Sequence, residues 1–233
     1  MAEALSIMGD LFVSPARAFS ALRDRPRWVL AATVISLCST TLALLLIPYS
    51  LEILSQMLRD RFDAQTLRRV VAGIRSFSLL GAVATPAVLI AKWLLVSGIF
   101  SSLAVLLTAR PVRFGSVLSV IVHAELILLL MGLVNLAILA LRGPDTIRSA
   151  ADLCAIPGLL TVVHSTPLPQ PLITLLANAN PFTVWYLVLL SMGLSTVMEV
   201  PRWKSGLAVL TVWVIMLGWT IAFSRAAETA SLP

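Results

Sequence analysis

The stretch VLSVIVHAELILLLMGLVNLAIL, residues 117–139, decides the fold of this chain. It is a run of about 23 mostly apolar residues, long enough for one helix to cross a hydrocarbon core about 30 Å thick. His123 and Glu125 lie near its first third. A carboxylate at that depth costs roughly 2.5–3.5 kcal/mol on insertion scales, so we expect it to face other helices or water rather than lipid. The other spans must then be arranged to cover it.

The composition of the whole chain agrees with this interpretation. Hydrophobic residues make up 59% of the 233 residues and charged residues only 12%, about half the charged share of a soluble domain. The net charge of +6 lies in loops and at the ends of apolar runs, where basic residues anchor to headgroups and set topology. The absence of a basic stripe interleaved with aromatic residues argues against a nucleic-acid partner.

The N-terminal segment, residues 1–27, is predicted to be an amphipathic interfacial region. Its apolar residues, which include Leu11, Phe12 and Phe19, recur at steps of three and four, the pattern of a helix lying in the membrane interface. The pair Ser14-Pro15 suits an N-cap and a first helical turn, so we expect two short helices with a break near residue 14. No cleavable signal peptide is expected.

Residues 28–225 are predicted to form an all-α domain of five transmembrane helices, with spans at about 28–48, 86–107, 117–139, 182–198 and 207–223. Residues 50–75 are interpreted either as an amphipathic helical hairpin or as a solvated connector. Short helices are expected in the long connection 142–180. The residues expected to anchor the chain at the membrane interfaces are Arg23, Arg25, Arg27, Trp28, Trp93 and Trp185.

Topology follows from how the basic residues are distributed. They are equally numerous on the two sides, but those on the N-terminal side sit in short segments close to span ends. The positive-inside rule applies best there, so we expect a cytoplasmic N-terminus and an external C-terminus.

The intramembrane polar centre is expected to comprise His123, Glu125 and Lys92. His123 and Glu125 point roughly 200° apart on one helix, so they are not a dyad that shares a face. The centre could sense protons or cations, but we favour a structural role in which each group is satisfied separately. For Lys92, an axial offset of roughly 10 Å from Glu125 favours snorkelling beside Trp93 over pairing.

Catalytic and metal-binding motifs are missing from the sequence. There is no GxSxG elbow, HExxH or P-loop, so we do not expect an enzyme. Cys38 and Cys154 lie far apart and form no CxxC or Cys/His spacing. Neither a metal site nor a cofactor is expected.

Three segments together resemble the bacterial branch of the Yip-domain family: LFVSPARAFSALRDRPRW at 11–28, FGSVLSVIVHA at 114–124, and NPFTVWYLVLLSMGLSTVMEVPRWKSGLAVLTVWVI at 180–215. The resemblance implies five membrane helices, a cytoplasmic N-terminus and, for a bacterial member, the inner membrane. Eukaryotic relatives bind Rab-type GTPases. Bacterial ones can accompany an ABC exporter and its periplasmic adaptor. The family offers no catalytic residues to carry over.

We therefore expect a non-catalytic accessory or assembly subunit, in the bilayer, whose partner is a membrane complex such as an ABC exporter, or a second copy of the chain. One alternative is a small transporter or channel that uses the His/Glu/Lys centre. Another is a lipid-binding or membrane-shaping protein that works through residues 4–22.

Overall fold

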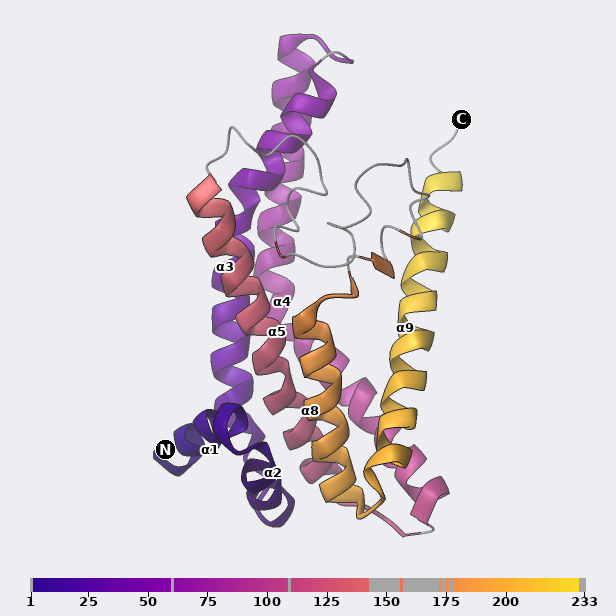
Figure 1. The fold of residues 1–233 in the computed structure, drawn as a ribbon. Coiled ribbons are helices and arrows are strands. Elements are labelled where there is room, and N and C mark those ends of the chain that lie inside the picture. The colour runs from indigo at the N-terminus through magenta and orange to yellow at the C-terminus, as the bar shows by residue number, and fades with distance from the viewer. Residues whose placement is uncertain are drawn as a thin grey trace.

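The structure is a computed structural model that describes residues 2–59, 61–108, 110–142, 156, 172, 175–176 and 178–230. The described residues are mainly helical and contain no strand. The helices are α1 (Ala2–Val13), α2 (Pro15–Asp24), α3 (Trp28–Leu58), α4 (Ala64–Thr108), α5 (Phe114–Arg142), α8 (Pro181–Met198) and α9 (Arg202–Ala230) (Figure 1).

Five of these helices, α3, α4, α5, α8 and α9, are long and apolar enough to cross a membrane. The expected all-α membrane protein with five spans is confirmed. Each predicted span lies within one of these helices, although the helices start earlier or end later than the apolar runs.

Helix α5 is the central element of the bundle. It packs against α3, α4 and α8, whereas α9 packs on the far side of α8 (Figure 1). Its apolar span is 61% buried inside the protein, against 17% to 39% for the other four spans. The helix that carries His123 and Glu125 is therefore the one that the others cover, as the cost of exposing a carboxylate to lipid requires.

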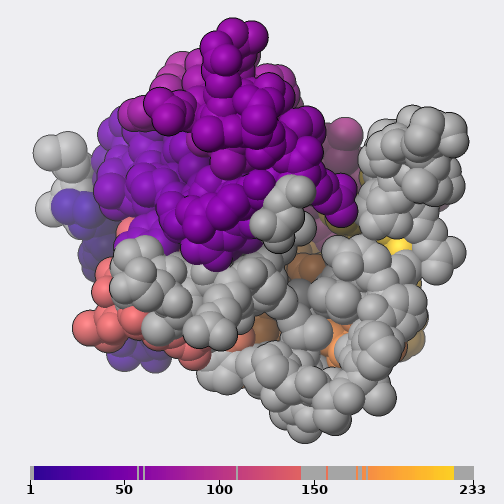
Figure 2. Space-filling view, turned by 90° about the horizontal axis from the view of Figure 1, so that it is seen from above, coloured from indigo at the N-terminus to yellow at the C-terminus, as the bar shows by residue number. Residues whose placement is uncertain are grey.

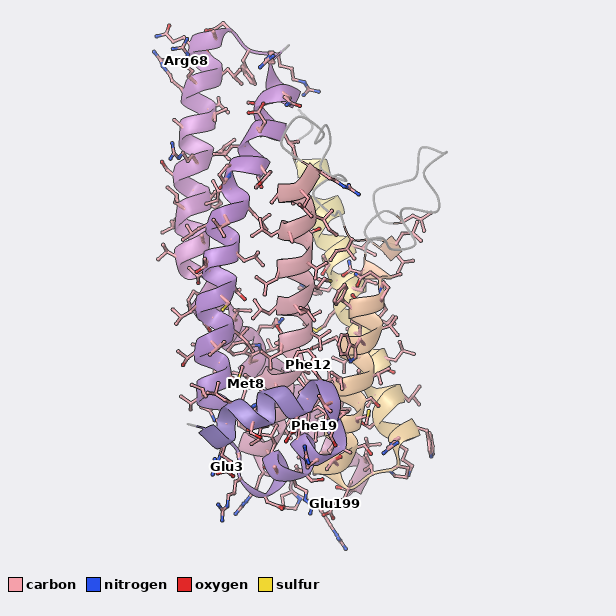
Figure 3. The ribbon with its side chains drawn as sticks, turned by 60° about the vertical axis from the view of Figure 1, so that its left-hand side comes forward. Glu3, Met8, Phe12, Phe19, Arg68 and Glu199 are labelled. Carbon is pink, nitrogen blue, oxygen red and sulfur yellow. The ribbon has the colours of Figure 1, made fainter. Side chains whose placement is uncertain are left out.

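The N-terminal segment forms two helices that break at Ser14, as the sequence predicts, and they lie across one end of the bundle (Figure 3). The sequence predicts that these helices lie in the membrane interface, and the structure shows that part of their apolar face packs on the bundle. Leu11 and Phe19 are buried in the main hydrophobic core, and α2 packs on α5 and α8. Of Leu11, Phe12 and Phe19, only Phe12 is partly exposed. Helices α1 and α2 thus bury part of their apolar face against the rest of the protein.

The first two spans are longer than predicted because each helix continues through a proline, Pro48 in α3 and Pro86 in α4. A proline removes one backbone hydrogen bond and is tolerated where neighbouring helices compensate. The second half of the hairpin considered for residues 50–75 and the second span are one helix, α4, of 45 residues. At about 1.5 Å per residue it is about 68 Å long.

The extra length produces an α3–α4 hairpin that extends beyond the other helices at the end of the bundle opposite α1 and α2 (Figure 1). Seen from that end, the hairpin occupies one side of the face (Figure 2). Of the two interpretations of residues 50–75, the helical hairpin is therefore the one that the fold adopts. The short helices expected between residues 142 and 180, and Cys154, lie almost entirely outside the described residues.

Candidate functional site

An ion pair inside the helix bundle joins α4 to α5. Lys92 Nζ of α4 lies 2.8 Å from Glu125 Oε2 of α5, with side-chain exposures of 37% and 5%. The carboxylate is thus enclosed by protein while the lysine stem reaches in from a partly exposed position. Glu125 is thus paired inside the bundle rather than left facing lipid.

The expectation that Lys92 snorkels away from Glu125 is wrong, and the cause is a helix boundary. Helix α5 begins at Phe114, three residues before the apolar run itself begins. Lys92 therefore lies 16 residues before the end of α4, and Glu125 lies 11 residues after the start of α5. The remaining offset is about 7.5 Å, which a lysine and a glutamate side chain span together.

Tyr186 of α8 lies beside the same carboxylate, and sequence reasoning missed it. Tyr186 and Glu125 line the same cavity, and no hydrogen bond joins the two side chains. Within the described residues, the second carboxylate oxygen, Oε1, is buried and accepts no hydrogen bond. Tyr186 had no distinguishing signal in the sequence, because it sits in an apolar run among interfacial aromatic residues.

A cavity of about 240 Å³ opens beside the ion pair, between α4, α5, α8 and α9. Its wall is mostly apolar, and Lys92, Glu125, Tyr186 and Thr183 are among its polar members. The arrangement can hold a charged pair out of lipid, and it leaves room for a small guest or for water next to Glu125.

His123 serves a different contact. Its Nδ1 lies 2.7 Å from the carbonyl oxygen of Ser119, one turn earlier on α5, and the ring is buried. A carbonyl can only accept, so Nδ1 carries the proton and donates it. His123 bonds within its own helix and Glu125 across to α4, so the two groups do not act as a dyad. Lys92 and Glu125 thus form an ion pair, while His123 makes a separate contact within α5.

Some of the expected interface anchors are paired with acidic residues, and others are exposed or half-buried. Arg27 pairs with Glu3 at 2.6 Å, and Arg23 with Asp24 at 3.2 Å, so these arginines bind other parts of the N-terminal region. Arg23 also lies 3.4 Å from Glu199 of the α8–α9 turn. Arg25 is exposed and Trp28 half-buried, as a headgroup position allows.

The two remaining tryptophans differ from each other. Trp93 is only 1% exposed and belongs to the hydrophobic core, so it does not reach the membrane surface. Trp185 is partly exposed and meets Phe12 edge to face, with ring centroids 5.8 Å apart. This contact connects α1 to α8.

In the described part of the chain, no cluster of three His, Cys, Asp or Glu side chains could hold a metal ion.

A family model, that of the Yip1 domain, matches residues 9–223. No curated protein and no solved structure matches the chain.

Proposed function

Because this chain belongs to the Yip1 domain family, we propose that it is a non-catalytic accessory or assembly subunit of a larger membrane complex. We further propose that it resides in a bacterial inner membrane with a cytoplasmic N-terminus, and that an ABC exporter is the kind of complex it serves. A second copy of the chain is the alternative partner.

The observation that carries this proposal is the α3–α4 hairpin. Helices of 31 and 45 residues exceed what a bilayer about 30 Å thick needs. The surplus forms an arm whose tip exposes basic side chains, and Figure 3 shows Arg68 at this tip. Below the tip, α4 exposes a run of large apolar residues: Phe77, Leu79, Leu80 and Val83. An arm with a charged tip and an apolar flank suits contact with a neighbouring membrane protein at and above the headgroup layer.

The contacts of Lys92, Glu125 and His123 also support a non-catalytic role. Lys92 neutralises Glu125, and His123 is bonded to its own helix. Both groups therefore have structural partners, as polar residues that bind membrane helices together do.

The test is purification of the full-length chain in a mild detergent, followed by mass spectrometry of the proteins that remain bound. We expect defined membrane partners, and we expect the double variant Arg61→Gln/Arg68→Gln at the hairpin tip to lose them. The matched control, Arg25→Gln/Arg202→Gln, removes two positive charges at the opposite end of the bundle and should keep them. Identical partners for both variants, or none for the wild type, would overturn the proposal.

The cavity beside Glu125 favours one second candidate, a small transporter or channel. That function requires a hydrated path to the carboxylate, and Glu125→Gln would abolish flux through reconstituted vesicles. For an accessory subunit the same variant keeps its partner and produces no change in flux.

A further inference from the structure

A second and larger cavity, of about 710 Å³, opens at the end of the bundle that carries α1 and α2. We call it the basal cleft. Seven parts of the fold contribute to it: the ends of α2, α4 and α8, the α4–α5 loop, the α8–α9 turn and the starts of α5 and α9. The hydroxyl of Ser116 donates to the carbonyl of Arg23 at 3.1 Å and so ties α2 to α5 at the cleft wall.

The charges that line the basal cleft are unequal. It contains four basic side chains, from Arg23, Arg110, Arg113 and Lys204, and two acidic ones, from Asp24 and Glu199. Both acids lie against the same arginine, Arg23, at 3.2 and 3.4 Å.

The other three cations are therefore available. Among the described residues, Arg110, Arg113 and Lys204 form no ion pair with a carboxylate. The Lys204 ammonium lies 5.6 Å from the ring centre of Trp203, a contact that keeps its charge.

Helix dipoles do not decide what the cleft attracts. The N-terminal ends of α5 and α9 open onto it, but so do the C-terminal ends of α2, α4 and α8. Their partial charges of opposite sign largely offset one another and leave a small negative remainder. The side chains set the potential, and their sum favours an anion.

Thr108 and Ser116 add hydroxyl groups to the wall. The apolar part of the wall consists of Leu107, Pro111, Val112, Val197, Met198, Val200 and Pro201. Directly above it, Leu106 on the outer surface of α4 is 79% exposed, in a stretch that the protein presents to lipid. Apolar side chains contribute nothing to the binding of a soluble phosphate ion. A molecule with an anionic head and an apolar body uses both parts.

We propose that the basal cleft binds the phosphate-bearing headgroup of an anionic phospholipid, whose acyl chains then lie along α4. The depth agrees, because the cleft sits where the apolar spans end and where basic residues meet headgroups. This inference does not depend on the accessory role, since it concerns a different end of the molecule from the α3–α4 hairpin.

The experiment measures thermal unfolding of the full-length protein in a neutral detergent during titration with short-chain phosphatidylglycerol. Short-chain phosphatidylcholine and inorganic phosphate are titrated in parallel. We expect phosphatidylglycerol alone to stabilise the protein strongly. In Arg110→Gln/Arg113→Gln the half-saturating concentration should rise roughly 10-fold or more. In the control Arg25→Gln/Arg202→Gln, which removes two charges on the same face but outside the cleft, it should stay within about 2-fold of the wild type.

A variant that is expected to bind the lipid more tightly distinguishes a loss of binding from a loss of folding. Glu199→Gln removes one of the two acids of the cleft and leaves Arg23 with Asp24 as its remaining acidic partner, so phosphatidylglycerol should bind several-fold more tightly. Equal responses to both lipids, equal losses in the cleft and control variants, or weaker binding by Glu199→Gln would overturn the proposal. Inorganic phosphate that matches the lipid at equal concentration would also overturn it, because the ligand would then be a soluble ion.

Discussion

The Lys92–Glu125 pair links two neighbouring helices at a point where the carboxylate is buried. Desolvation of two charges offsets much of their attraction, so such a pair adds little net stability compared with apolar residues of similar size. Removal of one partner is different, because the other charge stays behind without compensation. The pair is therefore better understood as a specific connection between α4 and α5 than as a large source of stability.

Replacement of Lys92 by Met should lower the free energy of unfolding by up to about 3 kcal/mol, since Glu125 then remains buried and unpaired. The double variant Lys92→Met/Glu125→Leu should recover most of this loss. Thermal unfolding in detergent gives the comparison, with Arg25→Met, at an exposed position, as the control for loss of a positive charge. A double variant no more stable than Lys92→Met would show that the pair is not what holds the two helices.

Helix packing depends on one glycine of α8. A Cβ atom on Gly193 would overlap the side chain of Val120 on α5 and would lie 2.8 Å from Cε1 of Phe19 on α2. The missing side chain allows α8 to approach α5 closely and lets the buried ring of Phe19 fill the space between three helices. The seating of the N-terminal helices thus depends on a residue in the fourth span.

Gly193→Ala should destabilise the protein by about 1–3 kcal/mol, because a well-packed interior must move to admit one methyl group. It should also release α1 and α2, which limited proteolysis near Ser14 detects. Gly218→Ala on α9 is the matched control, since a Cβ there meets nothing within 4 Å. Equal stability of the two variants would contradict this account of the packing.

The outer end of α4 begins with a cap at Asp63. Its carboxylate accepts hydrogen bonds from the backbone N–H groups of Gln65 at 3.0 Å and Thr66 at 3.1 Å. Hydrogen bonding from Thr66, through its side chain and then its backbone, lowers the pKa of Asp63 below its ordinary value of 3.8. The ionised cap therefore stabilises the first turn at neutral pH.

The sign of this shift sets a pH dependence. A carboxylate whose pKa is lower when folded stabilises the structure above its ordinary pKa, and the contribution disappears as the pH falls through the lower folded value. We expect amide protection at residues 64–68 to be high at neutral pH and to fall below about pH 4. Asp63→Ala should show the loss at every pH, while Asp63→Asn, which can still accept, should keep protection even in acid. Unchanged protection in Asp63→Ala would exclude the cap.

At the scale of the whole molecule, an odd number of crossings places the two ends apart. Helices α1 and α2 lie at one end of the bundle, while the hairpin tip and the end of α9 lie at the other (Figure 1). With the N-terminus cytoplasmic, as we propose, the α3–α4 hairpin projects outward and the basal cleft faces the inner leaflet.

Labelling with a membrane-impermeant maleimide tests this arrangement in cells. In a background without Cys38 and Cys154, Arg68→Cys should react in intact cells, and Arg25→Cys only after the membrane is permeabilised. The reverse pattern would invert the proposed orientation. Reaction of both cysteines from outside would contradict an odd number of crossings.

Sequence alone determined the helical class of the protein and the number of its apolar spans. Apolar runs long enough for a bilayer identify spans whatever their neighbours are, and the Ser14-Pro15 pair marks a helix break by local backbone chemistry alone. The same runs underestimated the first two spans, because polar residues continue a helix beyond the membrane without any apolar signal.

Only the tertiary structure decided which groups meet. The pairing of Lys92 with Glu125 depended on a shift of three residues in where α5 begins, and Tyr186 joined them through the packing of α8. The basal cleft draws its charges from α2, the α4–α5 loop, the α8–α9 turn and the start of α9, and the first two lie far from the others in the chain. Contacts of this kind depend on helix register and rotation, which follow from the fit of whole surfaces rather than from hydrophobicity along one segment.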